Sequence, residues 1–281
     1  MREERPAPTL PLSRVRTFRQ LIWRHYRENG RDLPWRRTRN PYRIFISEIM
    51  LQQTQVERVS AKYGEFVRRF PDFRALAEAP LHEILSAWQG LGYNRRAVAL
   101  KKAAMSVAAK FGGRLPSSET ELLSLPGVGR YTASALIAFV FNKPSVFIET
   151  NIRRVFIHLF FEDREDVGDA EIVPLVRETL DDSAPRDWYY ALMDYGVMLG
   201  KEVENPNRRS AHYRRQGPFE GSNRQARGMI LRELLKKSVS SEREIARKLG
   251  LTPDAVARNI AALEREGFIK RREGRILRVA T

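Results

Sequence analysis

The helical periodicity of residues 16–200 constrains the fold more than any other feature of this chain. Apolar residues recur there at spacings of three and four, as in Ile152, Val155 and Phe156, without the alternating runs that strands need. The sequence therefore predicts an all-α domain over 16–204, behind a loose, proline-rich tail at 1–15. Its clearest helical segments are 41–56, 81–88, 97–109, 130–141 and 150–160, with a short one near Glu119.

Residues 224–281 form a second pattern, behind a linker at 205–223 that is rich in turn formers. Three short helical segments, at about 224–237 and after the capping residues Ser241 and Thr252, precede a basic hairpin with a turn at Glu273-Gly274. This order predicts a winged helix, whose third helix commonly enters the major groove while the wing touches phosphates. A small helical protein-interaction module is the alternative, which the basic hairpin disfavours. The expected DNA contacts are Arg258, Lys270, Arg271, Arg272 and Arg275.

The charge of the chain indicates a polyanionic partner. Fifty Lys and Arg against 34 Asp and Glu give a net charge of +16 and a pI near 10.4. Residues 201–281 hold 20 basic and 10 acidic residues, so +10 of that charge lies in the last part of the chain. We therefore expect double-stranded DNA as the partner.

Composition excludes several classes of chemistry. Without cysteine the chain has no disulfide, thiolate nucleophile or cysteine-held zinc or iron–sulfur cluster, and its four scattered histidines predict no metal site. Its apolar runs are too short to span a bilayer, and its first residues lack the apolar stretch of a signal peptide. We expect a cytoplasmic, nucleoid-associated monomer with no cofactor and no membrane contact.

A glycine turn between two helical segments predicts a phosphate-docking hairpin. Glycine permits a tight turn and close approach, and the N–H groups at the start of the next helix form an anion site. Such docking carries no base information, because it engages only the DNA backbone. The residues involved are Gly127, Val128, Gly129 and Arg130, after Leu125-Pro126.

Two glutamates are candidate catalytic carboxylates. Glu48 lies among Ile44, Phe45 and Leu51 on its helix, where desolvation would raise its pKa and let it act as an acid near neutrality. A structural pairing with Arg31 or Arg36 is an equal alternative. Glu149 begins a helix, where the dipole favours negative charge, and on spacing alone a simple first-turn acid is the better interpretation.

Four motifs resemble the helix-hairpin-helix DNA glycosylases, and their MutY-type adenine branch in particular, over roughly residues 18–200. The resemblance implies a two-lobed helical fold with a DNA cleft and removal of a flipped base by hydrolysis of its N-glycosidic bond. The motifs are Arg31-Asp32-Leu33-Pro34-Trp35-Arg36, Ser47-Glu48-Ile49-Met50-Leu51-Gln52-Gln53-Thr54-Gln55-Val56, Gly90-Leu91-Gly92-Tyr93 and Leu125-Pro126-Gly127-Val128-Gly129-Arg130-Tyr131-Thr132.

The resemblance also implies roles by position. Glu48 matches the family's general acid, and Glu149 the carboxylate that stabilises the cationic sugar. Tyr131 and Asn151 match neighbours of the reaction centre, and Tyr131 stands where lyases carry a Schiff-base lysine, so no β-lyase activity is expected. The positions that match the base pocket are Arg31, Trp35, Leu51 and Asp194, and those that match the opposite-base and wedge residues are Gln53, Thr54, Leu91 and Tyr93.

The chain departs from the family at three places. The four cluster cysteines expected after about residue 198 are missing, and polar contacts of Lys201–Arg215 are expected to brace that region. The nucleotide-hydrolase-like domain that reads 8-oxoguanine is replaced by the winged helix. The family's aspartate is Glu149 and its pocket glutamate is Asp194, so we expect Thr150 to take over the helix cap.

Three functions remain open from these residues. The first is a monofunctional glycosylase of base excision repair that removes adenine opposite 8-oxoguanine or guanine. The second is a glycosylase that removes thymine or uracil from mismatches, for which the altered Glu149 and Asp194 leave room. The third is a protein that binds distorted DNA without catalysis, in which Glu48 and its motif would have no reason to be intact.

Overall fold

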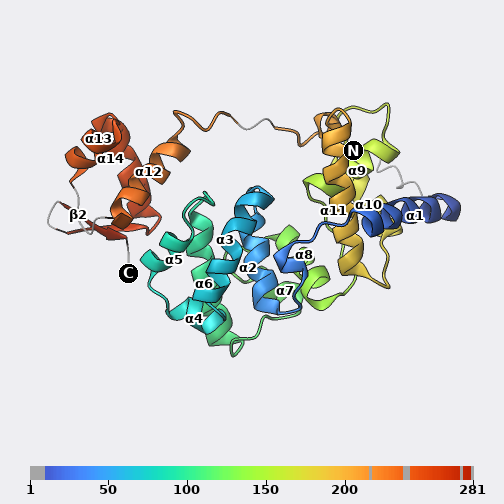
Figure 1. Cartoon of the computed structure of the whole chain (residues 1–281), viewed down its shortest axis with the longest axis horizontal. Coiled ribbons are helices and arrows are strands. Elements are labelled where there is room, and N and C mark those ends of the chain that lie inside the picture. The colour runs from blue at the N-terminus through green and yellow to red at the C-terminus, as the bar shows by residue number, and fades with distance from the viewer. Residues whose placement is uncertain (1–9, 215–216, 237–240, 273–274, 280–281) are drawn as a thin grey trace, which may run out of the picture. The chain divides into compact units, whose positions relative to one another are not determined.

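The described part of the chain is almost wholly helical, in agreement with the periodicity (Figure 1). Figure 1 shows a computed structural model, which describes residues 10–214, 217–236, 241–272 and 275–279, Arg272 and the last strand by backbone alone. The chain divides into two compact units. Unit 1 comprises Met1–Asn40, Ser117–Leu123 and Val128–Arg215, and unit 2 comprises Pro41–Pro116, Ser124–Gly127 and Gln216–Thr281.

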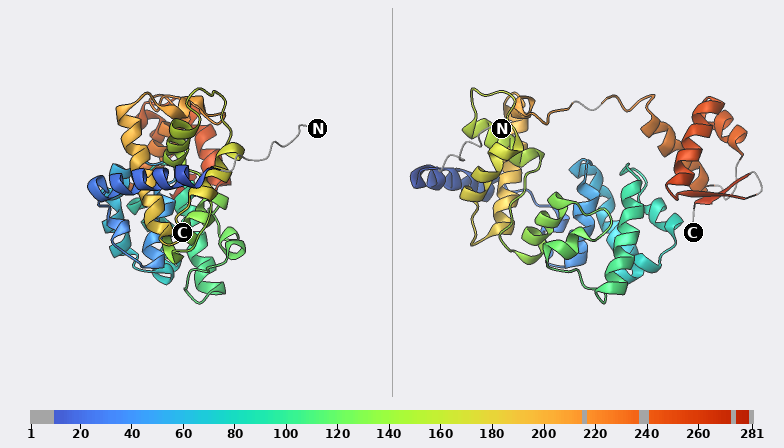
Figure 2. Two further views of the ribbon diagram at one scale, coloured as in Figure 1. Left: turned by 90° about the vertical axis from the view of Figure 1, so that its right-hand side faces the viewer. Right: turned by 180° about the vertical axis from the view of Figure 1, so that it is seen from behind.

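Unit 1 is built around the long helix α11. Its elements are α1 (Leu12–Asn29), η1 (Pro34–Arg36), α7 (Glu119–Leu123), α8 (Arg130–Phe141), α9 (Thr150–Phe160), α10 (Asp169–Thr179), α11 (Pro185–Glu202) and η2 (Pro206–Arg209). Helix α11 packs against α9 and against α1. The left view of Figure 2 shows α1 crossing α11. The aromatic rings of Phe18, Phe156 and Trp188 meet in the core between these three helices.

Unit 2 contains a helical part and the winged helix. The helical part comprises α2 (Pro41–Leu51), α3 (Val56–Arg69), α4 (Phe73–Glu78), α5 (Leu81–Ala87) and α6 (Arg95–Lys110). The rest comprises α12 (Asn223–Lys236), α13 (Glu242–Leu249), α14 (Pro253–Arg265) and the antiparallel strands β1 (Ile269–Arg272) and β2 (Arg275–Val279). Ser241 and Thr252 cap α13 and α14 by accepting hydrogen bonds from Glu244 N and Ala255 N, as their sequences predict.

Two predicted boundaries are wrong. Helix α1 begins at Leu12, so residues 12–15 are helical and do not belong to a loose tail. The helix predicted over 41–56 is two helices, because α2 ends at Leu51 and α3 begins at Val56. Between them Gln53 has a φ of 52°, which no helix can contain. The predicted turn at Glu273-Gly274 lies outside the described residues.

Basic side chains from distant parts of the sequence bind the C-terminal carbonyl groups of five helices. A helix leaves its last four carbonyl groups without an internal partner, and its dipole favours a cation there. Each of these side chains therefore fastens one helix end to another part of its unit. They are Arg96 at α2, Lys101 at α4, Arg186 at α8, Arg209 at α9 and Arg19 at α10.

The described helices include none that is both long and apolar enough to cross a membrane.

The contact of α9 with α11 depends on Gly196. A Cβ atom at this position would lie 2.7 Å from Asn151 Cβ and still closer to Asn151 O. We expect Gly196→Ala to lower the free energy of unfolding by ~1–3 kcal/mol, because the two helices must separate to admit the methyl group. Gly64→Ala is the control: it lies in α3 with open space around it and should raise stability by up to ~1 kcal/mol. Thermal unfolding of both variants tests this, and equal melting temperatures would contradict it.

Candidate active site and DNA-binding elements

Glu48 is a buried carboxylate on an otherwise apolar helix. Its residue is 7% exposed in the last half of α2, where Ile44, Phe45 and Ile49 are also buried. The predicted desolvation is therefore present. Arg31 and Arg36, the alternative partners for Glu48, both bind another carboxylate in unit 1.

That carboxylate is Asp194 of α11, which the sequence placed in the base pocket. Its oxygens accept hydrogen bonds from Arg31 N at 2.8 Å, Arg31 Nε at 2.6 Å and Arg36 Nη1 and Nη2 at 2.7 and 2.8 Å. Burial alone would raise its pKa, but the Arg36 and Arg31 groups outweigh burial, and the pKa of Asp194 is lowered. Asp194 is thus an ionised anchor that holds the segment after α1 against α11.

Glu149 is the N-cap of α9. Its Oε1 accepts hydrogen bonds from Asn151 N at 2.7 Å and Ile152 N at 2.8 Å, and its Oε2 from Asn151 Nδ2 at 3.1 Å. The expectation that Thr150 takes over this cap is wrong, since Thr150 is the first residue of the helix and the longer side chain of Glu149 folds back to reach the same donors. Burial raises the pKa of Glu149 despite these hydrogen bonds and the nearby Arg154.

The other predicted pocket and catalytic residues are distributed over both units. Tyr131 is the second residue of α8 in unit 1 and makes an edge contact with Phe147 at a ring distance of 5.6 Å. Trp35 is 3% exposed in η1, also in unit 1, whereas Leu51 ends α2 in unit 2 and is half-buried. Glu48 and Glu149 likewise belong to different units.

Arg96 joins the two segments predicted to probe the DNA. Its Nη1 donates hydrogen bonds to the carbonyl groups of Ile49 at 3.0 Å, Met50 at 2.8 Å and Gln52. Its Nη2 donates to Thr54 Oγ1 at 2.8 Å and to the carbonyl groups of Leu91 at 3.2 Å and Gly92 at 3.1 Å. The guanidinium thereby brings together Thr54, Leu91 and, through a ring contact of 5.7 Å, Tyr93.

The glycine turn after α7 has the expected geometry at one of its two glycines. Gly127 has a φ of 83°, and a Cβ there would lie 2.9 Å from Ala99 Cβ, so the position requires glycine. Gly129 has an extended conformation with open space around it and is the N-cap of α8. Val128 is buried and anchors the turn, and Arg130 is exposed at the first position of α8.

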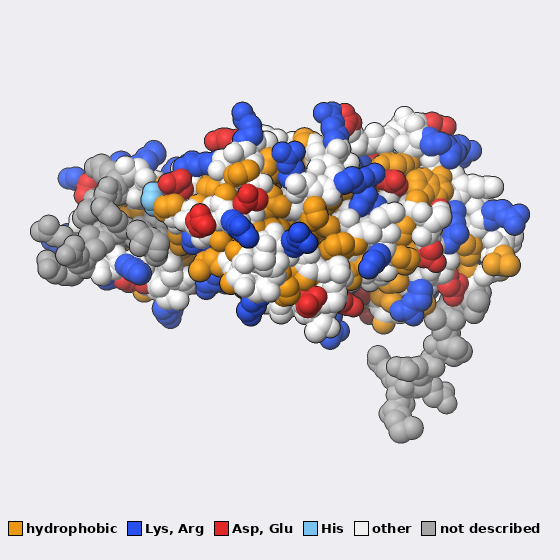
Figure 3. Space-filling view, turned by 90° about the horizontal axis from the view of Figure 1, so that it is seen from below, with side chains coloured by type: hydrophobic (Ala, Val, Ile, Leu, Met, Phe, Trp, Pro, Cys, Tyr) orange, Lys and Arg blue, Asp and Glu red, His pale blue; other side chains and the backbone are white. Residues whose placement is uncertain are grey.

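The winged helix exposes some of its predicted DNA contacts and engages another internally. Arg258 on α14 and Lys270 on β1 are exposed. Arg271 pairs with Glu242 at 2.6 Å and Glu264 at 2.7 Å, and so ties β1 to α13 and α14. The side chains of Arg272 and Arg275 lie outside the described residues. Elsewhere Lys and Arg side chains are scattered over the face seen in Figure 3, with acidic side chains between them.

The segment behind α11 is braced by polar contacts where the family resemblance would place a metal cluster. Asn207 Nδ2 donates to Thr150 O at 2.9 Å, and Arg209 donates to carbonyl groups of Ile157, Phe161 and Glu162. Asparagine amides and arginine are not ligands of an iron–sulfur cluster, and the chain has no cysteine. The residues present therefore do not fit such a cluster, and the described residues contain no group of three or more His, Asp or Glu arranged for a metal.

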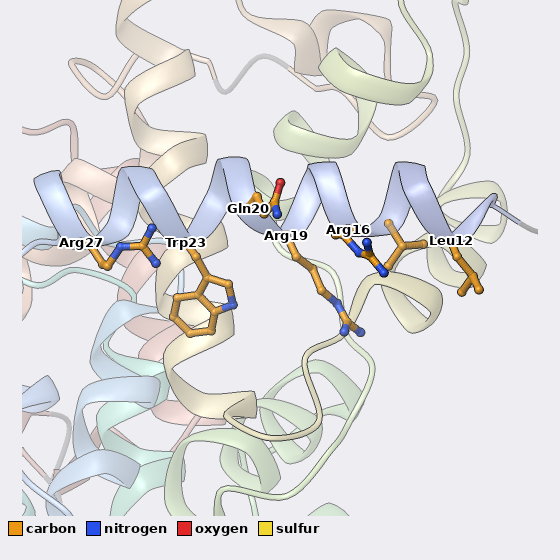
Figure 4. A pocket seen from close by; sticks show the side chains of 7 residues that line it. Leu12, Arg16, Arg19, Gln20, Trp23 and Arg27 are labelled. Carbon is orange, nitrogen blue, oxygen red and sulfur yellow. The ribbon is translucent and has the colours of Figure 1, made fainter.

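A pocket of about 390 Å³ lies along α1, apart from every predicted site residue (Figure 4). Leu12, Val15 and Trp23 supply its apolar lining and Arg16, Arg19 and Arg27 its charge. Arg19 also binds Thr179 O at 3.0 Å, and Trp23 Nε1 donates to Asp181 at 2.9 Å, so both hold α1 to the end of α10. The pocket has neither an acid nor a nucleophile in its lining, and it is not the candidate active site.

Sequence reasoning missed the groups that position these residues. Arg154 binds Asn151 Oδ1 at 3.0 Å and Gly196 O at 2.6 Å, Arg36 binds Asp194, and Arg96 binds the two probing segments. All three are arginines in a chain with many, and each of them has at least one partner more than 40 residues away. Only the Arg95-Arg96 pair, one residue after the Gly-Leu-Gly-Tyr motif, carried a local signal.

Comparison with known proteins agrees with both parts of the chain. Residues 46–172 match the family described as HhH-GPD superfamily base excision DNA repair protein, and residues 224–270 match a winged helix-turn-helix DNA-binding family. Among solved structures, a thermostable thymine-DNA glycosylase is 28% identical with a TM-score of 0.61, covering 69% of this chain and 91% of that one. An endonuclease III–DNA covalent intermediate, 22% identical with a TM-score of 0.54, covers 75% of this chain and 92% of that one and shares the fold.

Several curated relatives carry the name adenine DNA glycosylase. The protein of Buchnera aphidicola subsp. Baizongia pistaciae is 39% identical over 65% of this chain and 52% of its own length. That of Mycobacterium tuberculosis is 38% identical over 64% and 60%, and that of Homo sapiens 33% identical over 67% and 37%. The chain thus spans between about a third and three fifths of these relatives. The chain thus carries an HhH-GPD domain of base excision DNA repair proteins at residues 46–172 and a winged helix-turn-helix behind it at residues 224–270.

Proposed function

We propose that this protein is a monofunctional DNA N-glycosylase that removes adenine mispaired with 8-oxoguanine or guanine. The names of its curated relatives support adenine as the base. The observation that carries the proposal is Glu48, a carboxylate of 7% exposure on the apolar helix α2. A buried acid is costly to a fold, and this one immediately precedes the segment that Arg96 holds.

The proposed chemistry divides between two carboxyl groups. Glu48 donates a proton to the adenine ring, so that the C–N bond breaks with its electron pair leaving on a neutral base. Glu149, as a carboxylate oriented by three hydrogen bonds, stabilises the positive charge that develops on the sugar and accepts a proton from the water that attacks C1′. Water supplies the new hydroxyl group, and the products are adenine and an abasic site.

Several further features belong to the proposal. Tyr131 offers no amine for a Schiff base, so the abasic strand stays uncleaved. Double-stranded DNA is held by the turn at Gly127–Arg130 and by the exposed basic residues Arg258 and Lys270 of the winged helix. The protein acts on the nucleoid as a monomer and without a resident cofactor, since the polar brace at Pro206–Arg209 occupies the segment where a cluster would be bound.

A second candidate is removal of thymine or uracil opposite guanine. It is favoured by the likeness to the thermostable thymine-DNA glycosylase, which this chain covers over 91% of its length. At the position where the family resemblance implies a pocket glutamate, the chain has the shorter Asp194, whose carboxylate is bound to two arginines. Base identity is therefore the first quantity to measure.

Base release from a panel of duplexes tests the function. We expect the protein to release adenine from A opposite 8-oxoguanine or G, and Glu48→Gln to reduce the single-turnover rate at least ~100-fold, because it removes the proton donor. The control is Asp32→Asn, which removes an exposed carboxylate paired with Arg37 and should leave the rate unchanged. Release of thymine or uracil without adenine would establish the second candidate, and release by no variant or substrate would leave only DNA binding.

The pH dependence of the rate tests the role of Glu149. The pKa of Glu149 lies above its ordinary value of 4.5 because of burial, and the mechanism needs its ionised form. The rate should therefore fall as the pH drops through this raised pKa, with the acid-side midpoint above 4.5. Glu149→Gln should lower the rate at least ~100-fold and should also abolish the fall in rate at low pH. A wild-type midpoint at or below 4.5, with the fold intact by circular dichroism, would contradict this role.

The salt dependence of DNA affinity tests the winged helix. Each phosphate contact steepens the slope of log K against log salt by about 0.9, so Arg258→Gln with Lys270→Gln should flatten it by ~2. Lys110→Gln, at the exposed end of α6, is the control and should leave the slope unchanged. An unaltered slope in the double variant would mean that these residues do not touch DNA.

A further inference from the structure

Arg96 is the most extensively bonded cation in the helical part of unit 2. The oxygen atoms that it binds belong to five backbone carbonyl groups and to the hydroxyl group of Thr54. Its guanidinium also lies over the rings of Trp88 at 5.3 Å and Tyr93 at 5.7 Å. Burial lowers the pKa of Arg96 to about 10, and this unfavourable environment is offset by the bonds to both segments.

The two segments that Arg96 joins are both strained. Gln53 has a φ of 52° and Tyr93 a φ of 45°, and neither residue is glycine. Non-glycine residues in the left-handed region are uncommon, and they persist where the surroundings fix them. Both side chains are exposed, so neither conformation is required to bury an apolar group in the core.

The bonds of Arg96 fall on the peptide groups that lead into these residues. Nη1 binds the carbonyl group of Gln52, which belongs to the peptide bond before Gln53. Nη2 binds the carbonyl group of Gly92 at 3.1 Å, which belongs to the peptide bond before Tyr93. One planar group therefore fixes the orientation of both peptides, and through Ile49 and Met50 it fastens them to the end of α2, the helix of Glu48.

We propose that Arg96 is a positioning residue that holds Gln53 and Tyr93 in strained, exposed conformations and so couples reading of the opposite base to extrusion of the target base. The inference rests on the proposed function, because both residues act there on the DNA. Base extrusion costs unstacking, and a rigid wedge that fills the gap offsets part of this cost. Without the bridge by Arg96 the two segments would move independently, and each of them would have to become ordered when the DNA binds.

Lysine cannot take the place of arginine here. The guanidinium spreads its donors over a rigid fork, whereas a lysine ammonium has three donors on one nitrogen and cannot reach both segments at once. Arg96→Lys therefore keeps the charge and removes the bridge. Arg68→Lys is a matched control, because Arg68 is exposed on α3 and donates a single bond, to Gly64 O at 3.2 Å.

The test measures extrusion directly, with a duplex that carries the fluorescent base 2-aminopurine opposite guanine. In the slowed Glu48→Gln background, at saturating protein and before base release, we expect a rise in fluorescence that Arg96→Lys reduces at least threefold. In the active protein, Arg96→Lys should lower the single-turnover rate tenfold or more while the dissociation constant changes less than threefold. Arg68→Lys should match the parent in all three measurements.

Three outcomes would overturn the proposal: an undiminished fluorescence rise in folded Arg96→Lys, a loss confined to the dissociation constant, or no rise in the parent. If Arg96→Lys does not fold, Thr54→Val decides, because it removes the hydroxyl group that binds Arg96 Nη2 and Leu91 O. An unchanged rise in that variant would equally refute the coupling. A protein that releases no base but retains the Arg96-dependent rise would refute the proposed function and leave this inference standing.

Discussion

The binding of helix C-terminal carbonyl groups by basic side chains is the interaction on which both units depend. A helix end that is buried with unpaired carbonyl groups is costly, because these groups lose their hydrogen bonds to water and gain none in return. Arg186, for example, donates to Phe139 O and to Val140 O at 2.8 Å, and so fixes the end of α8 to the start of α11. Arg19 and Arg209 do the same for α10 and α9.

This use of arginine changes the meaning of the net charge. A charge of +16 indicates a polyanion, but some of its cations are engaged in the fold and contribute little to phosphate contacts. Within the basic C-terminal part, Arg209 binds carbonyl groups of unit 1 and Arg271 is shared by two glutamates. Exposed side chains such as Arg130, Arg258 and Lys270 are the ones left for DNA. Counting charges therefore overestimates the electrostatic component of binding.

Local sequence patterns predicted the structural features that depend on neighbouring residues. The remaining features depend on contacts between residues that are distant in the sequence. The helices, the caps Ser241 and Thr252, the winged helix and the turn at Gly127 follow from spacing and side-chain chemistry within a few residues. The break at Gln53 did not, because apolar residues resume at Val56 after Leu51 and the strain there is held by Arg96 from another helix. The anchoring of Asp194 was equally invisible, since its partners lie more than 150 residues away.

Glu149 illustrates how a helix cap can be made by a side chain longer than the aspartate that the family resemblance implies. Glu149 keeps the helix-capping bonds by folding back on Asn151 N and Ile152 N, so the added methylene alters the path of the side chain and not its donors. The helix it caps is fixed at both ends, near its start by Asn207 on Thr150 O and at its end by Arg209. The position of a capping carboxylate depends on the position of its helix. The polar brace behind α11 therefore determines where the Glu149 carboxylate lies. The close contact of Gly196 with Asn151 determines how closely α9 packs against α11.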